Sequence, residues 1–240
     1  LDNTVIIYTS DHGELAGEHG LWWKRTYHEA STRVPLIISL PEHRRGELDA
    51  QEVRVPVSLG DLFPTLCGLA GVDVPEGLDG IDLSAVLRGD AHPNLENRTG
   101  VIVEHLSSFA GGGTEYRMIR SERYKYVAFR DCEDLAFDLL NDPDEQHNLL
   151  LSAEGSVADE LERLRTALLD GFDFGRVEAS LREERQAFMK QFPSRVKPRT
   201  ANQILLGDGR LVDADLPLEY PEVVSENMAG DFDDWPWTDT

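Results

Sequence analysis

The stretch V-I-I-Y-T-S-D-H-G-E-L-A-G-E-H-G-L-W-W-K-R-T-Y-H-E-A-S-T-R-V-P, residues 5–35, decides the fold. Residues 4–9 form a short, apolar, β-branched run that is typical of a buried strand. The run stops at Asp11 and His12, and α/β folds place chemistry just past the C-terminal edge of such a strand. A carboxylate and a neutral imidazole can give two ligands to one divalent cation. Taken alone, residues 10–13 are equally compatible with an ordinary turn.

The residues that follow favour a site over a turn. Three glycines within residues 13–20 are expected to keep the backbone of a loop loose. Trp22 and Trp23 then anchor the loop, and Lys24 follows at once. A lysine presented by an aromatic anchor above a metal pair is suited to hold an oxyanion.

These motifs resemble those of the sulfatase family, within the alkaline-phosphatase-like superfamily. The resemblance rests on S-D-H-G-E, G-E-H-G-L-W-W-K and E-A-S-T-R-V-P-L-I-I, which occur in this order with suitable spacing. It implies that Asp11 and His12 bind the active-site metal, with Ca²⁺ as the first choice and Mn²⁺ as the alternative. It also implies that Lys24 is catalytic and contacts the sulfate or phosphate oxygens. Choline-sulfatase-like and phosphonate monoester hydrolase-like members are the most similar.

The resemblance implies an α/β fold in three parts. Residues 1–95 are expected to be the C-terminal part of the catalytic domain, an alkaline-phosphatase-like mixed sheet with flanking helices. Residues 96–170 are expected to form a small antiparallel-sheet and helix subdomain, because a polar break rich in Asp, Asn, Gly and Pro precedes them. Residues 171–240 are expected to be a helix and an acidic C-terminal arm.

Local patterns predict the individual elements. A second buried strand is expected at residues 34–40, and an apolar stripe predicts a helix that ends at Gly71. Short alternating runs predict an antiparallel meander, and a Leu-rich i, i+4, i+7 pattern predicts an amphipathic helix. The expected strands are 101–105, 116–120, 124–129 and 135–139, and the expected helices are 156–169 and 177–188. The F-D-L…D-P-D-E…N-L segment, residues 137–149, resembles the structural end of the sulfatase C-terminal subdomain.

Several other polar residues are candidates for chemistry. His105 ends a strand near the point where related enzymes bring the C-terminal subdomain towards the pocket, so a substrate-binding role is open to it beside Lys24. Asp61 is expected to be a carboxylate at a helix start rather than a catalytic group. His19 and His28 are expected to be exposed loop residues.

Sulfatases use a formylglycine made from Cys or Ser in C/S-x-P-S/T-R. Neither Cys67 nor Cys132 lies in that motif, and residues 191–195 have its P-S-R ending with Gln in the nucleophile position. The resemblance therefore implies a sulfuric ester hydrolase whose formylglycine comes from an N-terminal part absent from this chain. We expect the chain by itself to be inactive and to bind metal weakly.

Composition limits the partners. A formal net charge of −22 argues against nucleic acid, and no apolar run is long enough to cross a bilayer. The expected partners are a small-molecule sulfate ester and, through an acidic arm without Lys or Arg from Leu211 onward, a second copy of the chain. The chain starts at Leu1 and enters a strand almost immediately, so we expect its N-terminal part to be absent. The cellular compartment is therefore left open, with the cytoplasm favoured.

Two alternatives remain open from the sequence. A phosphonate monoester or phosphodiester hydrolase of the same superfamily shares the Asp-His pair and the Lys. A truncated, non-catalytic binding or assembly module would keep the fold without the chemistry.

Overall fold

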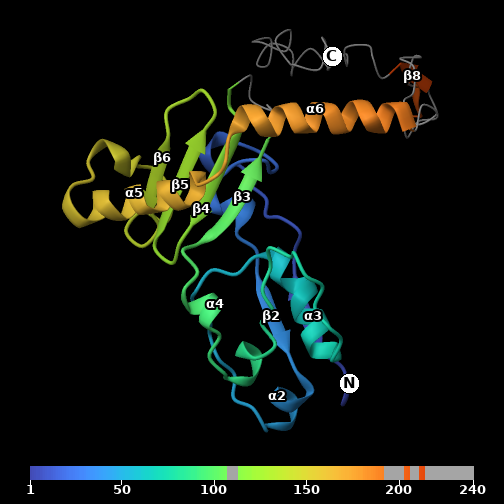
Figure 1. Ribbon diagram of the computed structural model, residues 1–240. Helices are drawn as coiled ribbons and strands as arrows, with labels where there is room; N and C mark the ends of the chain where they lie inside the picture. The colour runs from blue at the N-terminus through green and yellow to red at the C-terminus, as the bar shows by residue number, and fades with distance from the viewer. Residues whose placement is uncertain (107–112, 192–202, 206–210, 214–240) are drawn as a thin grey trace. The chain divides into compact units, whose positions relative to one another are not determined.

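The computed structural model describes residues 1–106, 113–191, 203–205 and 211–213 (Figure 1). The chain divides into two compact units, residues 1–172 and 173–240, and each is described by itself. The boundary expected between residues 95 and 96 falls inside the first unit and stays a prediction.

The first strand pair lies on either side of the motif loop, which we define as residues 10–28. Strand β1 (Ile6–Thr9) pairs antiparallel with β2 (Leu36–Ser39), so that Tyr8 faces Ile37. The prediction of two strands in one sheet is confirmed, but their expected burial is wrong. Tyr8 is 63% exposed and Ile37 is 62% exposed. Alternate side chains of a ladder point to opposite faces, and the described residues cover only one face of this pair.

Short helices connect this pair to the second sheet. The predicted apolar stripe forms α3 (Leu62–Ala70), which ends at Gly71 with a left-handed φ of 68°. Such a C-cap needs a residue without a Cβ penalty, so the predicted stop is confirmed. The other short helical segments of this connection are α2 (Pro41–Arg45), η2 (Leu59–Asp61), η3 (Val86–Arg88) and α4 (Pro93–Glu96). Two more, η1 (Glu18–Gly20) and α1 (Glu29–Thr32), lie between β1 and β2.

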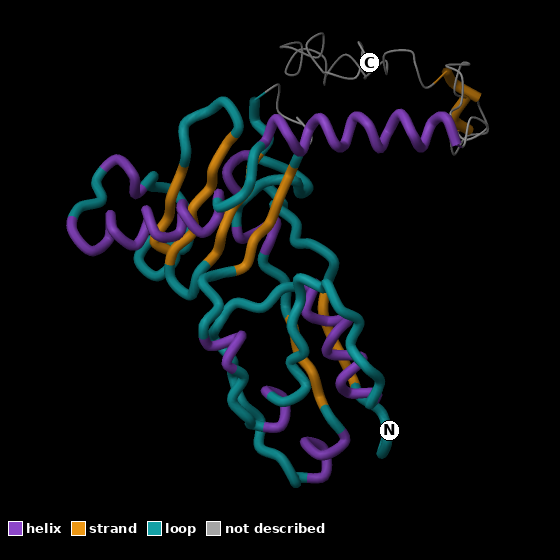
Figure 2. Tube along the Cα trace, in the orientation of Figure 1, coloured by secondary structure: helices purple, strands orange, loops and turns teal. Residues whose placement is uncertain are grey.

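The second sheet is a four-stranded antiparallel meander in the order β3-β4-β5-β6 (Figure 2). This confirms the predicted topology, with the last strand one residue shorter than expected. Its strands are β3 (Val101–His105), β4 (Tyr116–Arg120), β5 (Tyr124–Phe129) and β6 (Leu135–Asp138).

Helix α5 (Gly155–Leu169) lies across one face of this sheet, as Figure 1 shows, and confirms the predicted amphipathic helix. Its Leu161, Leu164 and Leu168 are almost fully buried against a cluster that includes Tyr126 of β5. Burial of each leucine contributes about 1.5–3 kcal/mol. The segment between β6 and α5 contains η4 (Leu149–Leu151).

The opposite face of the sheet receives the motif loop. Met118, Val127 and Phe137 form a second buried cluster on this face, and Tyr27 of the motif loop packs against it. The Tyr27 ring lies 6.2 Å from that of Phe137 and is nearly parallel to it. The two sheets of the first unit are therefore joined through the segment that carries the predicted site.

The second unit contains α6 (Phe174–Gln191) and a two-stranded antiparallel sheet of β7 (Gln203–Leu205) and β8 (Leu211–Asp213). The predicted helix is confirmed and is longer than residues 177–188. Residues 214–240 of the predicted arm lie outside the described residues. Among the described residues, no helix is both long and apolar enough to cross a membrane.

Candidate functional site

Backbone hydrogen bonds give the motif loop a fixed conformation, although its glycines were expected to keep it loose. Leu15 N–H donates to Trp23 O at 2.8 Å, and Gly17 N–H donates to Leu21 O at 2.9 Å. Leu15 is fully buried beneath the loop. The expectation of a loose backbone is therefore wrong, because these bonds and one buried side chain close the loop on itself.

Gly13 holds the loop against α1. Its N–H donates to Ser31 O at 2.9 Å, and a Cβ at this position would lie 1.9 Å from Ala30 O. Only glycine allows so close an approach of two backbones. The residue after His12 is consequently tied to the short helix that follows Lys24.

Asp11, His12 and Lys24 come together at one point. The Nε2 atom of His12 lies 3.3 Å from Asp11 Oδ2 and 2.5 Å from Lys24 Nζ. His12 Nδ1 lies 2.7 Å from Gly13 O, and a carbonyl can only accept. We therefore assign the proton to Nδ1, which leaves the lone pair on Nε2 facing both Asp11 and Lys24. This is the tautomer that a metal-binding histidine needs.

The electrostatics of the site keep Asp11 ionised. Desolvation, the largest single effect, acts to raise the pKa of Asp11, whereas the N–H groups of residues 11 and 12, the charge of Lys24 and, where its ring is protonated, His12 act to lower it. The net effect lowers the pKa of this carboxyl below its usual value. Asp11 thus offers a negatively charged oxygen beside the ring of His12.

This donor set fits a divalent cation as far as it goes. The hard carboxylate oxygen suits Ca²⁺. The neutral imidazole nitrogen suits Mn²⁺ or another transition metal. Over residues 1–106 and 113–191 and the two short strands, no group of three or more His, Cys, Asp and Glu side chains is placed to hold a metal. Within the described residues, the site therefore offers two candidate ligands, Asp11 and His12, and one lysine.

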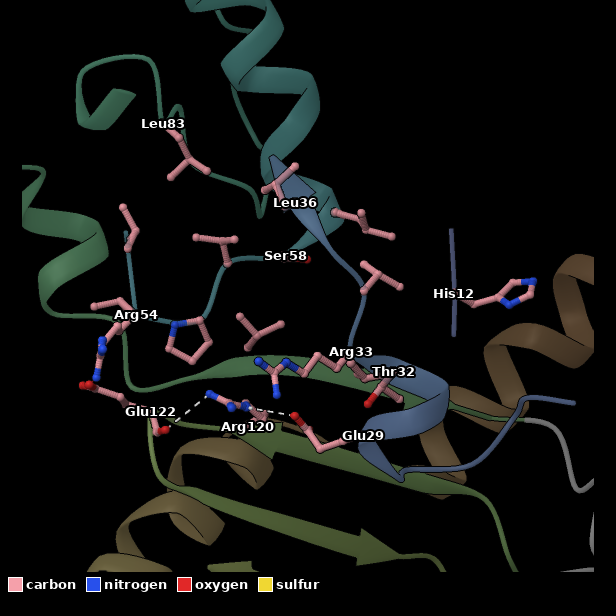
Figure 3. Close-up of a pocket in the computed structure, with 18 of the residues that line it drawn as sticks. His12, Glu29, Thr32, Arg33, Leu36, Arg54, Ser58, Leu83, Arg120 and Glu122 are labelled. Carbon is pink, nitrogen blue, oxygen red and sulfur yellow. Dashed lines mark hydrogen bonds and ion pairs between the residues drawn. The ribbon is translucent and has the colours of Figure 1, made fainter. Parts of the chain in front are cut away.

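All four predicted site residues line one cavity of about 1590 Å³ in the first unit. Asp11, His12 and Lys24 belong to the motif loop, and His105 belongs to the end of β3. Figure 3 shows part of this cavity, where Arg120 pairs with Glu29 and where His12 lies apart from them at one side.

His105 lines the same cavity but takes no part in the hydrogen bond between Lys24 and His12. Lys24 bonds to His12 and not to His105 in the described residues. Burial and the positive charge of Arg25 lower the pKa of His105, while Glu115 opposes them. The pKa of His105 is thus below its usual value, and its ring is neutral at neutral pH.

The structure assigns Asp61 to the fold, as predicted. Its buried carboxylate accepts two hydrogen bonds from Arg98 at 2.7 and 2.8 Å. It also accepts from the N–H groups of Ser58 at 2.7 Å and Ile81 at 2.9 Å. All of its acceptor capacity is directed at the chain itself.

The expectation that His28 is exposed is wrong. His28 is only 7% exposed, and its ring stacks on that of His19 with 3.7 Å between centroids. Burial, together with His19 and Lys125, lowers the pKa of His28 to about 4. Its neighbour Tyr27 packs on the sheet, and this contact takes His28 out of solvent.

Sequence reasoning missed the buried Lys125, which contacts Glu29 and Glu145. A lysine inside a predicted strand, as its second residue, was the available signal, since a buried ammonium needs partners. Its partners are distant in sequence, so no local pattern could name them.

Comparison with known proteins gives the family. Residues 17–170 match the family described as N-sulphoglucosamine sulphohydrolase, C-terminal. The chain belongs to this sulfatase family. It is 33% identical over 187 residues to arylsulfatase K of Xenopus laevis, covering 75% of this chain and 33% of that protein. It is 30% identical over 203 residues to the ulvan-active sulfatase of Formosa agariphila, covering 80% of this chain and 38% of that protein.

Solved structures agree with the predicted alkaline-phosphatase-like α/β fold. The structure of BT4656 with its substrate D-glucosamine-2-N,6-O-disulfate superposes with a TM-score of 0.56 at 30% identity. That match covers 72% of this chain and 36% of the other. The phosphonate monoester hydrolase of Agrobacterium radiobacter superposes with a TM-score of 0.54 at 28% identity, covering 88% and 39%. The chain thus spans about a third of the length of the arylsulfatase and the ulvan-active sulfatase.

Proposed function

We propose that the protein carrying this chain is a metal-dependent sulfuric ester hydrolase. One observation carries the proposal: in a chain of the sulfatase family, Asp11, His12 and Lys24 converge at the edge of one cavity. If residues 10–13 were only a structural turn, the side chain of Lys24, twelve residues later, would have no need to reach the His12 ring. An anion site beside a metal pair does require such a group.

Each side chain has a role that its surroundings support. Asp11 and His12 are the ligands from this chain, and Gly13 O orients the imidazole so that Nε2 faces the site. When bound, the cation supplies Lewis-acid stabilisation of charge on the ester oxygens. Lys24 neutralises the sulfate group and the oxygen that leaves with the alcohol. His105, on the same cavity wall, contacts the remainder of the substrate.

The nucleophile is proposed to be a formylglycine, as in other sulfatases. No C/S-x-P-S/T-R segment occurs in these 240 residues, so we propose that another part of the protein contributes it. Two of the similar proteins act on sulfated sugars, namely ulvan and D-glucosamine-2-N,6-O-disulfate. Sulfated sugars are therefore the first substrates to test beside simple aryl sulfates.

Phosphonate monoester hydrolysis is the second candidate. The observation that favours it is the superposition on the Agrobacterium radiobacter enzyme, which covers more of this chain than the sulfatase superposition does. An Asp-His pair and a lysine serve a phosphonate oxygen as well as a sulfate oxygen.

The test compares the intact protein on matched aryl sulfate and aryl phosphonate esters. We expect the sulfate ester to be turned over with the higher kcat/KM, and Lys24→Met to lower it about 10²–10³-fold. Lys190→Met, which removes an exposed lysine of α6, is the matched control and should leave turnover unchanged. Preference for the phosphonate would select the second candidate. Absence of turnover on both esters would favour a non-catalytic module.

A further inference from the structure

A buried cluster of charges links the four-stranded sheet to the motif loop. We define the Lys125 cluster as Lys125, Glu29, Glu145 and Arg120. Lys125 is fully buried in β5, and Glu145 is only 5% exposed at the turn after β6. Charged groups are rarely buried so completely unless their partners are fixed.

All three protons of the Lys125 ammonium have acceptors. Its Nζ donates to Glu145 Oε1 at 2.6 Å and to Tyr27 O at 2.7 Å, and it lies 2.8 Å from Glu29 Oε1. Two of these three acceptors belong to the segment that runs from the motif loop into α1. Because an ammonium has three donors, this geometry uses them all.

The two carboxylates extend the connection. Glu145 Oε2 accepts the N–H of Glu29 at 2.6 Å, which satisfies one of the free N–H groups at the start of α1. Glu29 Oε2 lies 3.7 Å from Arg120 Nε. Two positive charges, on Lys125 and Arg120, thus balance two negative charges, on Glu29 and Glu145, and the cluster is neutral overall.

Helix α1 carries the connection to the site. Its Ser31 O accepts the N–H of Gly13, the residue that follows His12 and whose carbonyl faces the His12 ring. Towards the N-terminus, Tyr27 lies only three residues after Lys24. A displacement of α1 from the sheet would therefore move both His12 and Lys24.

We infer that Lys125 is a positioning residue, which fixes α1 to the sheet and thereby holds His12 and Lys24 in their common geometry. Lys125 does not itself line the cavity with the site residues. Its role is to hold the motif loop at Tyr27 against strand β5, although Tyr27 and Lys125 are 98 residues apart in sequence. The catalytic part of this inference rests on the proposed function, and the positional part does not.

Amide hydrogen exchange tests the positional part directly. In Lys125→Met, Glu29 and Glu145 lose their common partner, so we expect the Gly13 amide to exchange at least tenfold faster than in the wild type. The double variant Lys125→Met/Glu145→Gln removes one charge of each sign, which keeps the cluster neutral and guards against loss of folding. It should show the same faster exchange at Gly13.

A second buried ion pair of the same unit provides the matched control. Asp61→Asn/Arg98→Met removes a pair whose contacts do not include α1. We expect this control to lower the melting temperature while exchange at Gly13 stays at the wild-type rate. Unchanged Gly13 exchange in both Lys125 variants would overturn the inference.

Kinetics of the intact protein on an aryl sulfate test the catalytic part. We expect kcat per folded molecule to fall about 10²-fold in both Lys125 variants, with KM nearly unchanged, because a displacement of about 1 Å has that effect. The loss should persist in the double variant after its melting temperature recovers. Recovery of kcat together with stability would reduce Lys125 to a structural residue. A wild type without turnover would refute the proposed function, and the exchange result would still decide the positional role.

Discussion

Replacement of Asp61 by alanine tests whether this buried carboxylate belongs to the fold or to the chemistry. The variant leaves the Arg98 guanidinium, whose side chain is only 13% exposed, without its partner. It also leaves the N–H groups of Ser58 and Ile81 without their acceptor. Breaking a buried ion pair by removing one partner costs about 3–5 kcal/mol.

For a unit of this size, about 1 kcal/mol corresponds to about 2–4 °C in the melting temperature, so Tm should fall by about 10 °C. Thermal and urea denaturation, followed by circular dichroism, measure the change. Burial alone would raise the pKa of Asp61, but the hydrogen bonds from Arg98, Ser58 and Ile81 outweigh it and lower the pKa below its usual value. The difference in stability between wild type and variant should therefore be full above about pH 4 and disappear as the pH falls further.

The activity of the same variant separates the two readings. We expect kcat per folded molecule to stay within about twofold of the wild type in the intact protein at a temperature where both are folded. A loss of turnover with an unchanged melting temperature would refute the structural reading of Asp61. A loss of stability below about 1 kcal/mol would refute the energetic argument.

Two further predictions concern the motif loop. The pKa of His28 is lowered to about 4, below the ordinary value near 6.5, so the folded state prefers the neutral ring. The contribution of the neutral His28 ring to the free energy of unfolding is complete above pH 6.5. It is lost as the pH falls towards 4, and the loss amounts to about 3 kcal/mol. His28→Gln should remove that part of the pH dependence in urea titrations, and an identical pH profile would contradict it. Gly13→Ala places a Cβ 1.9 Å from Ala30 O and should lower Tm by several degrees more than Gly46→Ala, a left-handed glycine with open space around it. Equal changes in Tm would show that the close approach is not needed.

The second sheet and its helix could be predicted from the sequence because their signals are local. The alternation of apolar residues in β3 to β6 can be read within each strand, and the spacing of the leucines in α5 can be read within that helix. The convergence of Asp11 and His12 with Lys24 could be predicted as well, because one short loop carries all three.

Other features depend on residues far away in the chain and could not be predicted. The burial of His28 follows from the packing of Tyr27 on β5 and β6, about a hundred residues later. The Lys125 cluster joins residues 29, 120, 125 and 145, and each looks like an ordinary charged residue in its own segment. The exposure of Tyr8 and Ile37 depends on what covers β1 and β2, which their own apolar sequences do not specify.

Metal content measured by mass spectrometry of the purified intact protein tests the central claim most directly. We predict about one divalent cation per wild-type chain, a marked loss in Asp11→Ala/His12→Ala, and full retention in Lys24→Met, which should nevertheless lose turnover. Retention of the wild-type metal content by Asp11→Ala/His12→Ala would contradict the account, because those two side chains would then not be the ligands.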